Sequence, residues 1–190
     1  MSGAPTIAYG LDLDGNLATV VRARRRGRAI HLETLASRQP LQALADTLHS
    51  LAAEQARGKA AIAVAAPAQD SVVRTLNAPF ASLAKARAVL PSLLDVQLPF
   101  PLEQCACHFI LAPQPRGEPV RATAVAMPSE RVTALLASLK TSGIDPDILD
   151  HEAVALWRQA DPAADEPTVV LYLGEERTVA VSGRGEPTAV

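Results

Sequence analysis

Residues 8–21 have the sequence AYGLDLDGNLATVV, in which two runs of mainly apolar residues flank the segment Asp14-Gly15-Asn16. Asp, Gly and Asn favour tight turns between antiparallel strands because they tolerate a left-handed backbone conformation. The pattern therefore predicts strands over residues 6–13 and 17–22, joined at this turn. Asp12 and Asp14 flank Leu13 just before Gly15, so the turn is also a candidate site for a phosphate group and its magnesium ion.

The segment after the second strand is strongly basic, with five arginines on either side of Gly27 at positions 22, 24, 25, 26 and 28. We expect this segment to form a turn, followed by a third strand over AIHLETLA at residues 29–36. A solvated hairpin tip is the simplest interpretation of the arginines. The alternative is a partner-binding patch made of Arg24, Arg25, Arg26 and Arg28.

The next segment changes from a strand pattern to a helix pattern. Leucines at positions 41, 44, 48 and 51 recur at helical spacing and predict a helix over residues 40–55. The apolar run AAIAVAAP at residues 60–67 lacks polar alternation, which is typical of a strand buried on both faces. Three antiparallel strands, a helix and a buried strand form the first half of a ribonuclease H-like unit.

The rest of the chain continues as an α/β pattern. Pro91 is expected to break or kink the helix that contains it. We expect helices at 82–98, 129–143 and 151–160, and strands at 106–113, 120–128, 146–150, 168–174 and 178–183, with a proline-rich turn at 114–119 and a linker at 160–167.

The composition excludes several classes of protein. The net charge of −2 provides no overall field for nucleic acid or anionic lipid, so nucleic-acid binding is not expected. No apolar run approaches the ~18 residues that a membrane-spanning helix needs. The first ten residues, MSGAPTIAYG, lack a basic segment followed by an apolar run, so no signal peptide is expected. These features predict a cytoplasmic location.

Catalytic and metal-binding motifs are not evident in the sequence. Cys105 and Cys107 are too close for an unstrained disulfide, the four histidines are dispersed, and we expect free, buried or half-buried thiols and no metal site. There is no nucleophile elbow and no Walker loop. The acidic residues Asp145, Asp147, Asp150 and Glu152 suggest paired carboxylates for hydrolysis or metal binding. A ribonuclease H-like nuclease, however, needs its carboxylates on central strands, where only Asp12 is expected.

Three features together resemble the actin-like family that includes the pilus assembly protein PilM and the cytoplasmic domain of the type II secretion protein GspL. The first is the hairpin YGLDLDGNLATVV near the N-terminus. The second is VVRTLNAPF, followed by a helix and LPFPLEQCACHFIL, and the third is TSGIDPDILDHEAVALWR. The resemblance extends to about residue 183.

This resemblance implies an actin-like, ribonuclease H-like α/β fold with mixed sheets and an inserted α+β subdomain. Residues 1–70 would form the first ribonuclease H-like subdomain, and 71–150 the inserted subdomain. Residues 151–190 would form the crossover helix and the first hairpin of an incomplete second lobe.

The resemblance also implies two phosphate hairpins, each with an Asp-apolar-Gly phrase at its turn. In the first, Asp12 matches the carboxylate, but Asp14 stands where glycine is expected, before Gly15. In the second, Gly174 matches the glycine and Thr178 keeps the hydroxyl, but Tyr172 replaces the carboxylate. Each hairpin lacks one working element, so we expect no catalytic residues, no metal, no nucleotide cofactor and no enzyme activity.

The function implied by the resemblance is a non-catalytic cytoplasmic scaffold of a type II secretion or type IV pilus assembly platform. The implied partners are the N-terminal domain of the assembly ATPase and other inner-membrane platform proteins. Membrane attachment would come only from a helix outside this chain. Two alternatives stay open: a PilM-type protein that binds a partner peptide under ATP control, and a peptide-docking module that uses the groove between the first subdomain and the insert.

Overall fold

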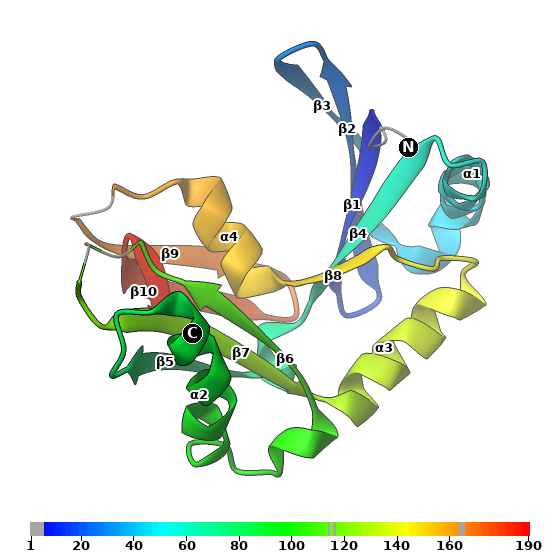
Figure 1. Cartoon of the computed structure of the whole chain (residues 1–190). Coiled ribbons are helices and arrows are strands. Elements are labelled where there is room, and N and C mark those ends of the chain that lie inside the picture. The colour runs from blue at the N-terminus through cyan, green and yellow to red at the C-terminus, as the bar shows by residue number, and fades with distance from the viewer. Residues whose placement is uncertain (1–5, 114, 116, 164–165) are drawn as a thin grey trace. The chain divides into compact units, whose positions relative to one another are not determined.

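Figure 1 shows the computed structural model, which describes residues 6–113, 115, 117–163 and 166–190. The chain divides into two compact units, each built from separate segments. Within the described residues, the first unit comprises 6–67, 133–152 and 174–177, and the second comprises the remaining segments. Residues 1–5 and parts of the turn expected at 114–119 and of the linker expected at 160–167 lie outside the described residues.

The first unit contains a five-stranded mixed sheet with the strand order β3-β2-β1-β4-β8. Strands β1, β2 and β3 form the expected antiparallel meander, while β4 runs parallel to β1, and β8 parallel to β4. The strands are β1 (Ile7–Asp14), β2 (Leu17–Arg26), β3 (Ala29–Pro40), β4 (Ala60–Ala66) and β8 (Ile148–His151).

The core of the first unit lies on one face of this sheet. The register places Leu11 beside Val20 on β2 and beside Val64 on β4, and all three side chains are buried. Helix α1 (Ala45–Ala56), which follows a 3-10 turn at Leu41–Leu44, and helix α3 (Ser129–Thr141) add leucines to the same core. Burial of these aliphatic side chains is the main force that holds the unit together.

The second unit contains two three-stranded antiparallel sheets, with the orders β5-β7-β6 and β11-β10-β9. Leu90 and Leu94 of α2 pack on Leu76 and on the buried alanines of β7. The elements are β5 (Val72–Ala78), α2 (Leu83–Asp95), β6 (Cys105–Leu111), β7 (Val120–Pro128), α4 (Glu152–Ala160), β9 (Pro167–Leu173), β10 (Thr178–Arg184) and β11 (Glu186–Ala189), with 3-10 turns at Ala68–Asp70 and Leu102–Gln104.

The units differ from the expected domains in their boundaries. Residues 71–150 were expected to form one inserted subdomain, but 133–150 belong to the first unit. The physical reason is that β8 pairs with β4 and that Leu139 and Ile144 pack in the core of the first unit. Residues 174–177, expected with the second lobe, also belong to the first unit.

Several elements also differ from the expected ones. Strand β2 continues to Arg26, so most of the arginines lie on a strand rather than in a turn. Pro91 lies inside α2 without ending it, and that helix stops at Asp95 rather than at residue 98. Strands β5 and β11 were not expected. In the part of the chain that the structure describes, no helix has the length and apolarity needed to cross a membrane.

His151, the last residue of β8, makes the stability of the fold depend on pH. Burial lowers its pKa to about 4, although the charge of Asp150 acts in the opposite direction. The unfolded chain binds this proton near pH 6.5, so between these values the unfolded state holds more protons than the folded state. The stabilisation is therefore complete above the unfolded pKa and is lost as pH falls towards the folded pKa.

Between pH 7 and pH 5 the free energy of unfolding should fall by about 2 kcal/mol less in His151→Gln than in the wild type. Thermal unfolding at the two pH values measures this change. The matched control His49→Gln, at an exposed position of α1, should keep the wild-type pH dependence. Equal pH dependence in the wild type and His151→Gln would contradict the prediction.

Candidate functional site

The turn between β1 and β2 is formed as expected, and its glycine is required for two reasons. Gly15 has a φ of +59°, which side-chain-bearing residues rarely adopt. A Cβ atom at this position would also lie 1.8 Å from a carboxylate oxygen of Glu176. The turn between β9 and β10, Gly174–Arg177, therefore packs directly against the first hairpin within the first unit.

Asp14 is held by this second turn. Its side chain is 7% exposed, and its Oδ2 accepts a hydrogen bond of 2.8 Å from the backbone N–H of Glu175. A Cβ atom on Gly174 would lie 2.4 Å from the same Oδ2, so only glycine leaves room for the carboxylate. The turn thus provides what an anion site needs, a backbone N–H and a glycine that permits close approach, and it binds a carboxylate of the same chain.

Arg177, the last residue of the second turn, lies among three carboxylates. Its guanidinium is 2.7 Å from Asp12, 3.1 Å from Asp14 and 2.7 Å from Glu152, and it also donates to the carbonyl oxygen of Leu13. The Arg177 side chain is only 11% exposed. We call these four charged residues, Arg177, Asp12, Asp14 and Glu152, the Arg177 cluster.

The electrostatics of the Arg177 cluster favour the charged guanidinium. Burial acts to lower the pKa of Arg177, but the negative charges and hydrogen bonds of Glu152 and Asp12 outweigh burial and raise it above its ordinary value. One positive charge faces three carboxylates at contact distance, so the cation offsets their mutual repulsion. The chemistry of this arrangement is that of an internal ion-pair network.

The structure brings only part of the predicted phosphate site into this cluster. Asp12, Asp14, Gly15 and Gly174 lie together in the first unit. Tyr172 and Thr178 belong to the second unit, where Tyr172 packs against a core that contains Trp157 and Val181, and Thr178 pairs with Leu173.

The other polar candidates have structural partners. The carboxylate of Asp147 accepts 2.8 Å hydrogen bonds from the backbone N–H of Ile62 and from the side chain of Gln55. Cys105 is half-buried, but Cys107 is exposed, so the expectation of a buried or half-buried thiol was wrong for Cys107. Among the described residues, no group of three His, Cys, Asp or Glu side chains has an arrangement that could hold a metal ion.

The candidate partner-binding arginines lie on β2 and in the turn that follows it. Arg24 is half-buried, while Arg25, Arg26 and Arg28 are exposed. The residues that sequence reasoning missed are Arg177 and the role of Glu152. The one hint in the sequence was the position of Arg177 at the end of the turn Gly-Glu-Glu-Arg, in the second predicted phosphate hairpin.

Replacing Arg177 by methionine should destabilise the first unit by roughly 3–5 kcal/mol, because three carboxylates would face one another without the cation. Urea unfolding followed by circular dichroism, with hydrogen exchange of the β1 amides, measures the change. Arg184→Met, at an exposed position of β10, is the matched control and should cost less than about 0.5 kcal/mol. Similar losses in the two variants would show that Arg177 does not stabilise the cluster.

Comparisons with known proteins support this description of the fold. No protein-family model matches the sequence, and no curated protein matches it either. Among solved structures, the chain is similar to the PilM-PilN type IV pilus biogenesis complex, with a TM-score of 0.68 and 22% identity over 96% of this chain and 60% of that one.

A second similar structure is the cytoplasmic domain of EpsL, an inner-membrane component of the type II secretion system of Vibrio cholerae. It has a TM-score of 0.58 and 17% identity over 97% of this chain and 71% of that one. This chain thus spans about three fifths of the PilM structure and somewhat more of the EpsL domain. The α/β fold expected from the sequence is confirmed: the chain has the actin-like fold of the PilM and EpsL structures.

Proposed function

We propose that this chain is a non-catalytic scaffold domain of a type II secretion or type IV pilus assembly platform, located on the cytoplasmic side of the inner membrane. Its role would be to link the assembly ATPase to inner-membrane components. The support is its likeness in fold to structures of two such machines, a PilM-PilN complex and the cytoplasmic domain of EpsL.

One observation carries the non-catalytic part of the proposal: Arg177 fills the space between the carboxylates of the first hairpin. In working members of the actin-like superfamily, the resemblance implies a phosphate and magnesium at this place. Here the cation is a guanidinium 2.7 Å from Asp12, and the anion at the glycine turn is Asp14. Phosphate and metal would have to displace a buried ion-pair network, which costs several kcal/mol.

A second candidate function is supported by the carboxylates themselves. Asp12, Asp14 and Glu152 are oxygen ligands of the kind that magnesium prefers. If Arg177 moved away, they would be available to a metal–nucleotide complex, as a PilM-type protein under ATP control requires. The two candidates differ in their response to nucleotide.

For the scaffold, we expect no stabilisation by nucleotide. With about 5 mM ATP and magnesium, the melting temperature should shift by less than about 1 °C, because no ligand binds the folded state. Asp12→Ala should give the same flat response. A clear upward shift in the wild type that disappears in Asp12→Ala would instead support the ATP-controlled alternative.

The partner is tested directly by titration calorimetry. The N-terminal domain of the cognate assembly ATPase should bind this chain with a dissociation constant below roughly 100 μM, an affinity typical of transient assembly contacts. The corresponding domain of an ATPase from an unrelated secretion machine is the control. Absence of heat at high micromolar concentrations would reject the proposed link to the ATPase.

A further inference from the structure

The basic hairpin, residues 22–33 of β2 and β3, carries charge that is concentrated in one place. Its five arginines and one glutamate give it a charge of +4, so the rest of the chain carries −6. The strand pairing of β1 with β2 reaches Arg24, and the backbone N–H of Arg25 still donates to the carbonyl oxygen of Thr6, so Arg26 is the first residue of the tip that pairs with β3 alone. Figure 1 shows the β2–β3 hairpin as a two-stranded extension of the sheet.

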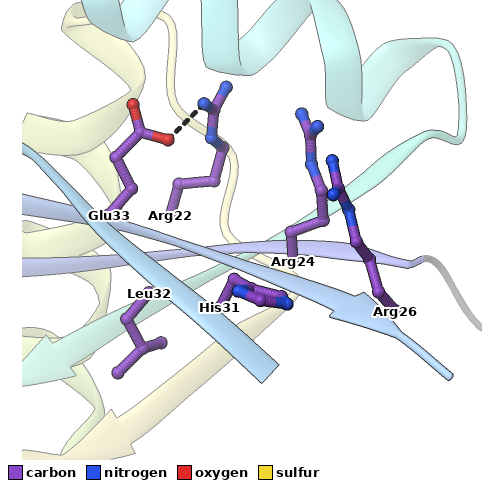
Figure 2. A pocket seen from close by; sticks show the side chains of 6 residues that line it. All are labelled: Arg22, Arg24, Arg26, His31, Leu32 and Glu33. Carbon is purple, nitrogen blue, oxygen red and sulfur yellow. Dashed lines mark hydrogen bonds and ion pairs between the residues drawn. The ribbon is translucent and has the colours of Figure 1, made fainter. Parts of the chain in front are cut away.

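Three of the arginines form a row along one face of the basic hairpin. Arg22, Arg24 and Arg26 alternate along β2, so their side chains share a face at spacings of about 7 Å. Figure 2 shows their guanidinium groups on one side of the hairpin ribbon and Leu32 on the other. Together with parts of β3, including His31, this arginine row lines a hollow of about 200 Å³.

Only one member of the row is neutralised. Arg22 forms an ion pair with Glu33 across the strands. Within residues 6–113, 115, 117–163 and 166–190, the structure records no ion pair for Arg24, Arg25, Arg26 or Arg28. Like charges close together repel one another, so the row favours binding of an anionic partner.

The opposite face of the basic hairpin carries two exposed aliphatic side chains, Ile30 and Leu32, with Arg25 beside Ile30. Ile30 and Leu32 alternate with His31 along β3, and their side chains are 66% and 67% exposed. Strand β3 is the edge of the five-stranded sheet, and no described strand pairs with its outer side. Between Ala29 and Thr34 the strand carries a single charged residue, Glu33, so charges on β3 itself do little to block pairing.

We propose that β3 accepts an extended acidic segment of a partner protein as an added strand. In this arrangement, acidic side chains of the segment lie on the face of the arginine row, and aliphatic side chains lie beside Ile30 and Leu32. The added strand would be two strand spacings, about 10 Å, from β2, a distance that arginine and glutamate side chains span together. The sequence preference is therefore acidic and aliphatic residues in alternation.

Other anionic partners fit fewer of these features. A nucleic acid would account for the arginines but not for Ile30, Leu32 or the open edge of β3. A bilayer surface is planar, whereas the arginine row and the two aliphatic side chains lie on opposite faces of the hairpin, so a bilayer contacts only one of them. An added strand contacts both faces and the edge.

This inference goes beyond the proposed scaffold function and does not depend on it. It requires only that the hairpin is folded, whichever machine the protein serves. A test with synthetic peptides therefore fails or succeeds independently of binding to the assembly ATPase.

The experiment measures binding of fluorescent octapeptides to the whole chain by anisotropy. A peptide of alternating glutamate and valine should bind with a dissociation constant below roughly 100 μM and more weakly at high salt. A block peptide, with four glutamates before four valines, and an alternating lysine–valine peptide should each bind about tenfold more weakly. Hydrogen exchange should show new protection of amides in residues 29–34 when the first peptide binds.

Matched variants distinguish binding through the arginine row from attraction by the net charge of the protein. Arg24→Glu with Arg26→Glu should weaken binding of the alternating glutamate–valine peptide about tenfold or more. Arg87→Glu with Arg184→Glu changes the net charge equally at exposed positions in the second unit and should leave binding unchanged. Leu32→Ser should weaken binding while leaving all arginines in place, and circular dichroism checks that each variant is folded.

Several outcomes would overturn the proposal. Equal binding of the block peptide, or no protection of residues 29–34, would leave only charge attraction and exclude an added strand. Tighter binding of duplex DNA or of phosphatidylglycerol vesicles than of the alternating peptide would assign the hairpin to nucleic acid or membrane instead. Equal loss of binding in the two double variants would show that general charge, and not the arginine row, attracts the peptide.

Discussion

One ion-pair network joins the three chain segments of the first unit: the guanidinium of Arg177 contacts Asp12, Asp14 and Glu152. These residues come from all three segments that form the unit: β1 belongs to the first, Glu152 to the second and Arg177 to the third. A buried carboxylate is costly unless it is paired, so each segment supplies charges that the others need. The network therefore specifies how three distant pieces of chain meet, in addition to any net stability that it contributes.

The turn that begins at Gly174 has the features of an anion-binding turn, and a carboxylate of the same chain occupies it. Gly174 leaves room for an anion beside the turn, and the N–H of Glu175 is directed at it, which is the same physical provision that a phosphate needs. Asp14 supplies the anion from within the chain. Asp14 stands where the resemblance leads us to expect glycine, and its carboxylate is accommodated by Arg177 and the second turn.

The local features of the fold were predictable, and the distant pairings were not. The turn at Gly15-Asn16 and the helix of leucines before residue 56 follow from local backbone preferences and periodicity, so the sequence alone indicates them. The pairing of β8 with β4 is accompanied by packing of Leu139 and Ile144 in the core of the first unit, whereas the sequence led us to expect these residues in the inserted subdomain. The contact between Asp14 and Arg177 spans 163 positions, and a single sequence holds no signal that pairs them.

The basic segment illustrates the same limit in another way. Five arginines close to a glycine suggest a polar turn, yet cross-strand pairing with β3 continues the strand through Arg26. Arginine is compatible with a strand because its long side chain carries the charged end out to solvent. The backbone hydrogen bonds between the strands do not involve the side-chain charge. Composition indicated an exposed segment here, and pairing decided its conformation.

The interleaving of the units also constrains the order in which the protein can be made and folded. During synthesis, residues 6–67 emerge early with Asp12 and Asp14 but without their cation, since Arg177 follows much later. Folding of domains proceeds from the N-terminus as the chain appears, but closing this long loop has to wait for its last segment. Residues 6–67 thus complete their contacts only after Arg177 has been made, and until then water solvates the carboxylates of Asp12 and Asp14.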